Sequence, residues 1–268
     1  MKTGYMIALA MVAGIFLSCG IGQGTDGKPG SGFNLFTVEQ DKQLGLQVAM
    51  EIESKPDEYP ILDSATNVSA YKYIYEIRDK ILSTGKVTHK NEFAWRIRIV
   101  KDDETLNAFC TPGGYIYVYT GIIKYLDNEA ELAGVMGHEM GHADLRHSTR
   151  QMTKIFGIQI LVNATLGDSS AIADITTALI GLKFSRDHET EADRMSVEYL
   201  CGTDWPADGA AGFFEKIEAS GGVGVPEWLS THPSPQNRIQ NYHTWASELA
   251  CPGKEKFEQR YAAFKKLF

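Results

Sequence analysis

The sequence predicts an α+β domain that is mainly α-helical and carries one small β-sheet. In several long stretches, apolar residues recur every three or four positions, which is the period of a helix with one buried face. Between two such stretches, residues 93–119 alternate apolar and polar positions around a Pro-Gly-Gly turn, the pattern of short strands. The length of residues 37–268 suits a single domain with its own core.

Residues 1–18 have the pattern of a secretory signal peptide. One basic residue, Lys2, precedes an apolar run from Met6 to Leu17. This run is too short to cross a bilayer as a helix, which needs about 20 residues. We therefore expect the chain to be exported.

The residues around Cys19 resemble a bacterial lipobox, Phe-Leu-Ser-Cys-Gly, in which cleavage before the cysteine is followed by its acylation. We expect Cys19 to be lipidated; simple signal cleavage with an incidental cysteine is the alternative. Gly20, in place of Asp, favours an outer-membrane lipoprotein of the cell envelope that faces the periplasm. Residues 19–36 are rich in glycine and form the expected flexible tether, so the lipid anchor is the expected membrane contact.

Charge and cysteine content narrow the class of protein further. A formal net charge of −8 without a basic cluster argues against binding to nucleic acid or, by charge, to anionic lipid. With Cys19 lipidated, Cys201 and Cys251 flank the late helical region and are the expected disulfide, while Cys110 is expected to be a buried thiol.

The folded domain should begin with two helices. Thr37-Val38-Glu39-Gln40 forms a capping box, and the helix should continue to about Ser54. Residues 67–83 have a second helical stripe, whose tyrosines we expect to be core rather than a binding site. Strands should follow at 93–99, 107–111 and 115–119.

The stretch from Asp127 to Ser148 contains His138-Glu139-Met140-Gly141-His142, an H-E-x-x-H pattern on a predicted helix. Residues four apart differ by only about 40° around a helix, so His138 and His142 can bind one metal ion. A zinc held in this way lowers the pKa of its water to about 7, and Glu139 is placed to take the proton. The alternative is a helix with ordinary buried histidines.

A catalytic zinc needs a third protein ligand, and Glu189-Thr190-Glu191-Ala192-Asp193 supplies candidates. Glu189 and Asp193 share one helical face, so Glu189 should bind the metal and Asp193 should accept the free N–H of a ligand histidine, His138 in particular. His147 falls on the opposite side of a straight helix, and we expect it to cap or pack the helix end.

These motifs together with Asn107-Ala108-Phe109, Pro112-Gly113-Gly114 and Ser185-Arg186 resemble the zinc metalloprotease family of HtpX, the CAAX prenyl protease, the mitochondrial Oma-type proteases and the periplasmic proteases BepA and LoiP. The resemblance covers residues from about 37 to about 242. It implies a gluzincin-type domain with a small sheet beside the active-site helix, Glu189 as the third ligand, and protein as the substrate.

His232-Pro233 and Arg238 match a late motif of that family, in which the histidine and the arginine lie near the metal. His232 is expected either to occupy the fourth coordination position in a resting state or to stabilise the oxyanion during turnover. Arg238 is expected to line the substrate side with it. The remaining histidines, His89, His188 and His243, have no partner pattern.

Metalloproteases hold an extended substrate along a strand with an open edge beside the zinc. The candidate for this strand is Gly114, Tyr115, Ile116, Tyr117 and Val118. The alternative is an interior strand without a free edge.

The function that the sequence predicts is a zinc endopeptidase with one Zn²⁺ per chain, acting on unfolded or misassembled proteins of the envelope. The competing class is a chaperone-like or scaffold lipoprotein whose zinc site is closed and mainly structural.

Overall fold

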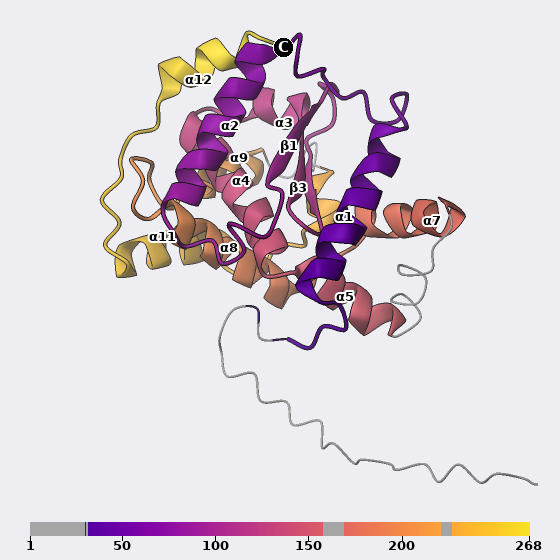
Figure 1. The fold of residues 1–268 in the computed structure, drawn as a ribbon. Coiled ribbons are helices and arrows are strands. Elements are labelled where there is room, and N and C mark those ends of the chain that lie inside the picture. The colour runs from indigo at the N-terminus through magenta and orange to yellow at the C-terminus, as the bar shows by residue number, and fades with distance from the viewer. Residues whose placement is uncertain (1–29, 31, 158–168, 221–226) are drawn as a thin grey trace, which may run out of the picture.

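The computed structural model describes residue 30 and residues 32–157, 169–220 and 227–268 (Figure 1). The predicted signal peptide, Cys19 and most of the tether lie outside these residues. The described elements, in chain order, are α1 (Val38–Glu53), α2 (Val68–Ser83), β1 (Arg96–Val100), β2 (Ala108–Thr111), β3 (Tyr115–Tyr119), α3 (Thr120–Tyr125), α4 (Glu129–Asp144), α5 (His147–Phe156), α7 (Ser169–Ile180), α8 (Arg186–Leu200), α9 (Ala211–Ala219), α10 (Trp228–Thr231), α11 (Arg238–Glu248) and α12 (Glu258–Lys265). The predicted class, mainly helical with a small sheet, is confirmed.

The three described strands form one sheet in the order β1-β3-β2. β1 runs parallel to β3, with Arg96 opposite Tyr115, and β2 runs antiparallel to β3, with Phe109 opposite Tyr117. The turn between β2 and β3 contains Gly113 and Gly114 at φ values of 74° and 81°, which side chains with a Cβ rarely adopt. The glycines of the predicted turn therefore permit the hairpin.

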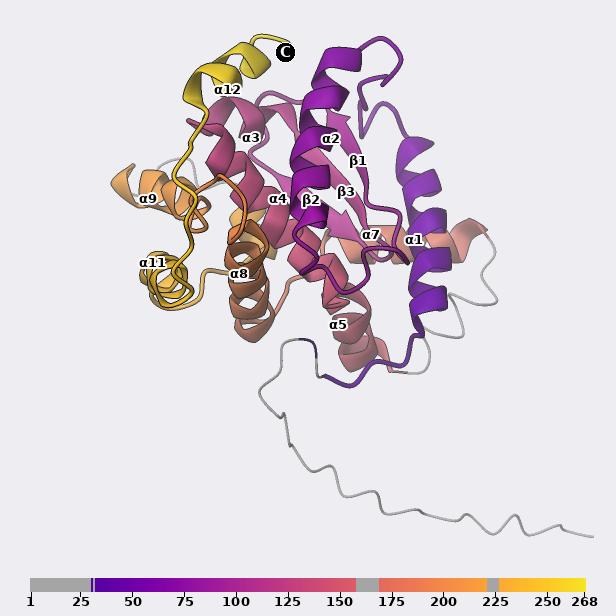
Figure 2. The same cartoon turned by 60° about the vertical axis from the view of Figure 1, so that its left-hand side comes forward.

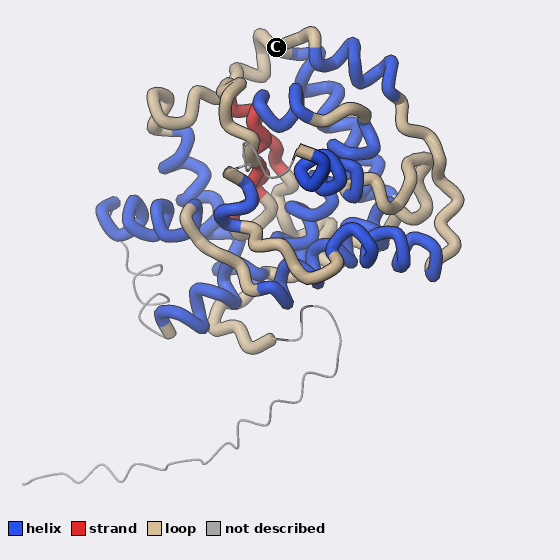
Figure 3. Tube along the Cα trace, turned by 180° about the vertical axis from the view of Figure 1, so that it is seen from behind, coloured by secondary structure: helices blue, strands red, loops and turns tan. Residues whose placement is uncertain are grey.

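The sheet separates two layers of helices, because successive side chains of a strand point to opposite faces. One face packs with α2 and α4 in the larger core, and the other packs with α1 and α7 in a second core rich in aromatic rings. The strands lie between α2 and α1 in two views, and helices and loops surround them when the molecule is seen from behind (Figures 2 and 3).

The N-terminal helices follow the predicted boundaries closely. Thr37 accepts a hydrogen bond from the main chain of Gln40, and the Gln40 side chain accepts one from Thr37, so the capping box is confirmed. The first strand is shorter than predicted, because Trp95 has a φ of 43° and interrupts the extended chain before Arg96. Phe93 and Trp95 are nevertheless buried in the core.

The close packing of α4 on α8 depends on glycines of the predicted metal helix. A Cβ at Gly137 would lie 3.0 Å from the Ser196 hydroxyl, and one at Gly141 would lie 3.2 Å from the Ala192 carbonyl oxygen. The Ser196 hydroxyl donates a hydrogen bond of 2.8 Å to the Gly134 carbonyl. Each glycine lowers the stability of the helix by about 1 kcal/mol relative to alanine, but it allows the two helices to pack closely.

The C-terminal elements are attached to this core by a disulfide and by a buried carboxylate. Cys201 and Cys251 are joined, with 4.9 Å between their Cα atoms, and Cys110 is a free, buried cysteine. Glu129 at the start of α4 accepts hydrogen bonds from Trp205 and from Arg260 of α12.

None of the described helices has both the length and the apolar character needed to cross a bilayer. From the sequence, the apolar stretches at residues 155–166 and 172–184, split by Gly167-Asp168-Ser169-Ser170, are expected to form a helical hairpin. Most of the first stretch and part of the connection, residues 158–168, lie outside the described part of the chain, and α7 packs against α1 and the sheet.

The contact between His89 and the C-terminal end of α4 should contribute less to the free energy of unfolding as pH rises. His89 Nδ1 lies 3.0 Å from Asp144 Oδ1, and this bond raises the pKa of His89 above its ordinary value of 6.5. A pKa raised by folding contributes stability that is complete below about pH 6.5 and is lost as pH rises through the folded value.

Urea unfolding of the metal-free protein between about pH 5.5 and pH 8.5 tests this expectation. His89→Asn should lower the free energy of unfolding most at the acidic end, and the difference from the wild type should shrink at the alkaline end. A difference that is constant across this range would show that His89 is not the group responsible.

Candidate metal centre

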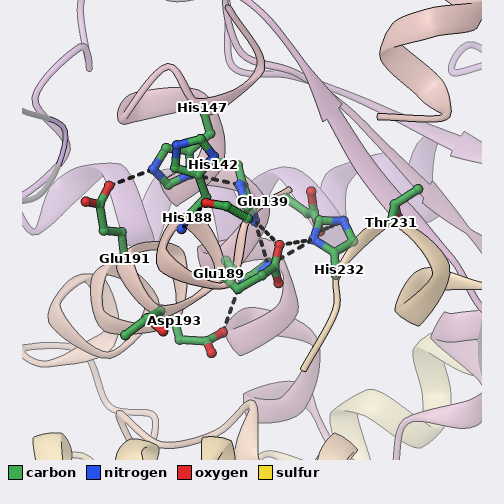
Figure 4. Close-up of polar contacts among 12 residues, drawn as sticks. Glu139, His142, His147, His188, Glu189, Glu191, Asp193, Thr231 and His232 are labelled. Atoms are coloured by element: carbon green, nitrogen blue, oxygen red, sulfur yellow. Dashed lines mark hydrogen bonds and ion pairs between the residues drawn. The ribbon is translucent and has the colours of Figure 1, made fainter. Parts of the chain in front are cut away.

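Two helices bring the predicted ligands together in the core. His138 and His142 project from α4, and Glu189 projects from α8. The side chains of His142 and Glu189 are labelled in the close-up of this site (Figure 4). The Nε2 atoms of the two histidines are 2.9 Å apart, and the Glu189 carboxylate oxygens lie 3.5 Å from His138 Nε2 and 3.3 Å from His142 Nε2. All three side chains are buried. The donor atoms therefore converge on one point.

The donor set fits zinc, which takes imidazole nitrogen and carboxylate oxygen in a site with few ligands. Burial lowers the pKa of His138 to about 3, so its ring is neutral and can offer a lone pair at neutral pH. Burial acts to raise the pKa of Glu189, but the neighbouring His232 and His142 outweigh it and hold this pKa well below its usual value. A neutral His138 nitrogen and a negative Glu189 oxygen therefore face the same point.

Asp193 lies behind His138, on the side away from the cluster. Its Oδ1 is 2.8 Å from His138 Nδ1, so the ring donates to the carboxylate through Nδ1 and leaves Nε2 free for a metal. The same oxygen accepts hydrogen bonds from Arg238 at 2.7 Å and from Tyr242 at 2.8 Å. Arg238 also donates to Glu189 at 3.0 Å. One guanidinium therefore holds both carboxylates.

Glu139 is fully buried beside the donor atoms and is held by a tryptophan. Its Oε1 accepts a hydrogen bond of 2.9 Å from the indole N–H of Trp228, while its Oε2 has no hydrogen-bond partner among the described residues. Burial raises the pKa of Glu139 to about 7. A carboxylate with this pKa and one free oxygen is suited to exchange a proton near neutral pH.

His232 lies among the predicted ligands, at the end of α10. Its Nδ1 is 3.1 Å from Glu189 Oε1 and 3.3 Å from His138 Nε2, and its ring stacks on Trp228 with 4.4 Å between centroids. One potential ligand atom from each of His138, His142, Glu189 and His232 lies within 4.8 Å of the others. The side chain of His232 is thus at the position of a fourth donor.

The predicted substrate strand was placed wrongly. Gly114, Tyr115, Ile116, Tyr117 and Val118 precede and form β3, which is the central strand and is paired on both sides. Alternation of side chains identifies a strand but not its place in the sheet, so the sequence pattern could not show that this strand has no free edge.

The unpaired edge of the sheet beside the metal helix belongs to β2. The Tyr119 N–H donates a hydrogen bond to the Asn107 carbonyl. Along an antiparallel strand, residues that bond to the partner strand alternate with residues whose main chain faces away. The main chain of Phe109 therefore faces β3, and that of Ala108 and Cys110 faces away from it. Within the described parts of the chain, no strand pairs with that outer side. β2 packs against α4, so this edge lies beside the metal helix. Burial, and next the charge of Glu139, raises the pKa of Cys110.

Sequence reasoning did not assign a role to Trp228 or Tyr242, and it underestimated His147. Trp228 lies four residues before His232, a helical spacing that signals one shared face. His147 is not among the converging donors, as expected, but its Nδ1 lies 2.9 Å from Nδ1 of His142. Arg146, at a φ of 59°, ends the straight course of α4 and brings His147 back under it.

Comparison with known proteins identifies a family that matches this chain. The family model of peptidase family M48 matches residues 71–246, which include every residue of the cluster. The chain is 34% identical to mitochondrial metalloendopeptidase OMA1 of Arabidopsis thaliana, over 56% of this chain and 31% of that protein. It is 28% identical to the beta-barrel assembly-enhancing protease of Escherichia coli K12, over 66% of this chain and 40% of the relative.

Metalloprotease YcaL of Escherichia coli K12 is 32% identical over 51% of this chain and 56% of its own length. The matches thus span less than half of the first two relatives. The family model, by contrast, extends over most of the described domain. On this match, the chain belongs to peptidase family M48.

Proposed function

We propose that this protein is a zinc endopeptidase with one Zn²⁺ per chain. The observation that carries the proposal is the convergence of His138, His142 and Glu189 on one point with the buried Glu139 carboxylate beside it. Membership of peptidase family M48 and relatives with metalloendopeptidase names support it. A zinc ion in this site would polarise a water molecule and the scissile carbonyl.

The residues of the chain have separate roles in this proposal. Glu139 takes the proton of the attacking water and returns it to the leaving amine. Asp193 orients His138, and Arg238 keeps Asp193 and Glu189 in place. The outward main chain of Ala108 and Cys110 would hold an extended peptide by hydrogen bonds that do not depend on its sequence.

The proposed substrates are unfolded or misassembled proteins of the bacterial cell envelope. Main-chain recognition along a strand requires an extended segment, which folded proteins rarely expose. The export signal predicted at residues 1–18 and the similarity to a beta-barrel assembly-enhancing protease support an envelope location. Cys19 is the proposed lipid anchor at the outer membrane. The mitochondrial relatives are also named metalloendopeptidases, so they support the same reaction but not the envelope location.

Degradation of casein, an unfolded protein, tests the proposal directly. The purified protein should cleave casein with zinc present and stop when a chelator removes the metal. Zinc binding without cleavage of casein or unfolded envelope proteins would favour the competing function, a chaperone-like or scaffold protein with a closed zinc site.

Replacement of His232 by Ala should raise the basal peptidase activity. The imidazole of His232 lies among the other donors, where it would take the position that a catalytic zinc site leaves for water and substrate, so its removal would open that position. His243→Ala is the matched control, because that histidine is exposed and contacts only Asp208 and Glu215 among charged groups. Initial rates of casein cleavage measure the effect.

The direction of the change separates the two roles of His232. Lower activity in His232→Ala would indicate that the ring stabilises the oxyanion instead. A rate equal to that of the wild type would discard both roles.

A further inference from the structure

The second ring nitrogen of His142 points away from the donor cluster and contacts another histidine. His142 Nε2 faces His138 and Glu189, whereas its Nδ1 lies 2.9 Å from Nδ1 of His147. The Nε2 of His147 in turn lies 2.9 Å from Oε2 of Glu191 (Figure 4). His147 has 0% of its surface exposed. Two rings and a carboxylate therefore form a continuous line from the cluster toward the surface.

The carboxylate at the end of this line sets the position of every proton in it. Oε2 of Glu191 accepts hydrogen bonds from Arg150 and from the Gly30 main chain, so it acts as an acceptor toward His147 as well. His147 therefore carries its proton on Nε2 and keeps a lone pair on Nδ1. That lone pair accepts the proton on His142 Nδ1, which leaves the lone pair of His142 on Nε2. Nε2 is the atom that faces the other ligands.

The carboxylate and the middle ring of the line are held from several elements. Glu191 Oε2 accepts hydrogen bonds from Arg150 at 3.1 Å and from the Gly30 main chain at 3.3 Å. His188 stacks on His147 with 4.4 Å between centroids and 12° between ring planes. Because α5, α8 and residue 30 all contribute, the His147 ring has one orientation.

We propose that His147 and Glu191 are positioning residues that hold His142 in the tautomer and orientation required to bind the metal. They would do for His142 what Asp193 does for His138 on the other side of the cluster. The proposal rests on the metal site of the proposed function. It assigns His147 a role beyond the packing of the helix end.

Zinc affinity of His147→Phe, measured by competition with a chromophoric chelator, tests the proposal. Phe keeps the ring but removes the acceptor for His142 Nδ1–H, and zinc binding should weaken by about 10–100-fold. His147→Asn places an amide oxygen near the position of Nδ1 and should restore much of the affinity. Tyr199→Phe is the structural control, because it removes a buried hydrogen bond to Asp144 from α8 without touching the donors.

Glu191 provides an independent variant at a site that tolerates change, since its side chain is 26% exposed. Glu191→Leu should weaken zinc binding, whereas Glu191→Gln retains an oxygen that accepts from His147 and should bind nearly as the wild type does. Zinc affinities of His147→Phe and Glu191→Leu equal to that of the control would overturn the proposal.

Metal binding is measured without substrate, so this test is separate from that of the proposed function. A wild type that binds zinc but never cleaves protein would refute the peptidase assignment and leave the positioning role standing. Melting temperatures of the metal-free variants, close to that of Tyr199→Phe, should show that the loss of affinity is not a loss of fold.

Discussion

Glu139→Gln should retain zinc and the fold but lose proteolysis by about 10²–10⁴-fold, the usual contribution of a general base. The amide has the shape of the carboxylate, and its oxygen can still accept the hydrogen bond that Trp228 donates to Glu139 Oε1. It cannot take a proton from water. Metal content and the rate of casein cleavage, measured on the same preparation, separate binding from chemistry.

Glu131→Gln is the matched control for this variant. Glu131 is also a buried carboxylate of α4, but it accepts hydrogen bonds from Asn128 and the Asp127 main chain at the start of the helix, away from the cluster. Its replacement should leave the rate per folded molecule unchanged. Full activity in Glu139→Gln would refute the role assigned to Glu139.

Arg238→Met should lower the free energy of unfolding of the metal-free protein by about 3–5 kcal/mol, the cost of removing one partner from a buried ionic group. Arg238 is 3% exposed and donates to both Glu189 and Asp193, which are themselves buried. The guanidinium also lies over the ring of Phe214, 4.2 Å from its centroid. Without it, two carboxylates would remain in the core without their cation.

Urea unfolding with a chelator present measures this loss, and Arg260→Met supplies the comparison. Arg260 also binds a buried carboxylate, Glu129, but its own side chain is 47% exposed, so water can replace part of the contact. A smaller loss in Arg238→Met than in Arg260→Met would mean that the carboxylates of the metal site do not depend on Arg238 for their charge.

The convergence of the proposed zinc ligands was predictable because their geometry is largely local. His138 and His142 share a face through the period of one helix, and Glu189 and Asp193 share a face through the period of another. Gly137 and Gly141, which are poor helix formers, also indicated that another element packs closely against this helix, although not that this element would be α8. The family resemblance then predicted that these two helices contribute to one metal site.

The substrate strand and the contacts of His147 were not predictable in the same way. Alternation marks a strand, but hydrogen bonding between strands far apart in the chain decides which of them has a free edge, and here it is β2 rather than β3. A straight helix would place His147 on the side away from the donors, but the positive φ of Arg146 ends the helix before His147.

From the sequence alone followed the helical character of the domain, its capping box, its family and the residue types of a zinc site. Only the tertiary structure decided that Arg238 donates hydrogen bonds to two carboxylates, that Trp228 donates one to Glu139, and that Glu191 is linked to His142 through His147. Local periods depend on backbone geometry within one element, whereas these contacts arise where separate elements pack, and no period in the chain encodes them.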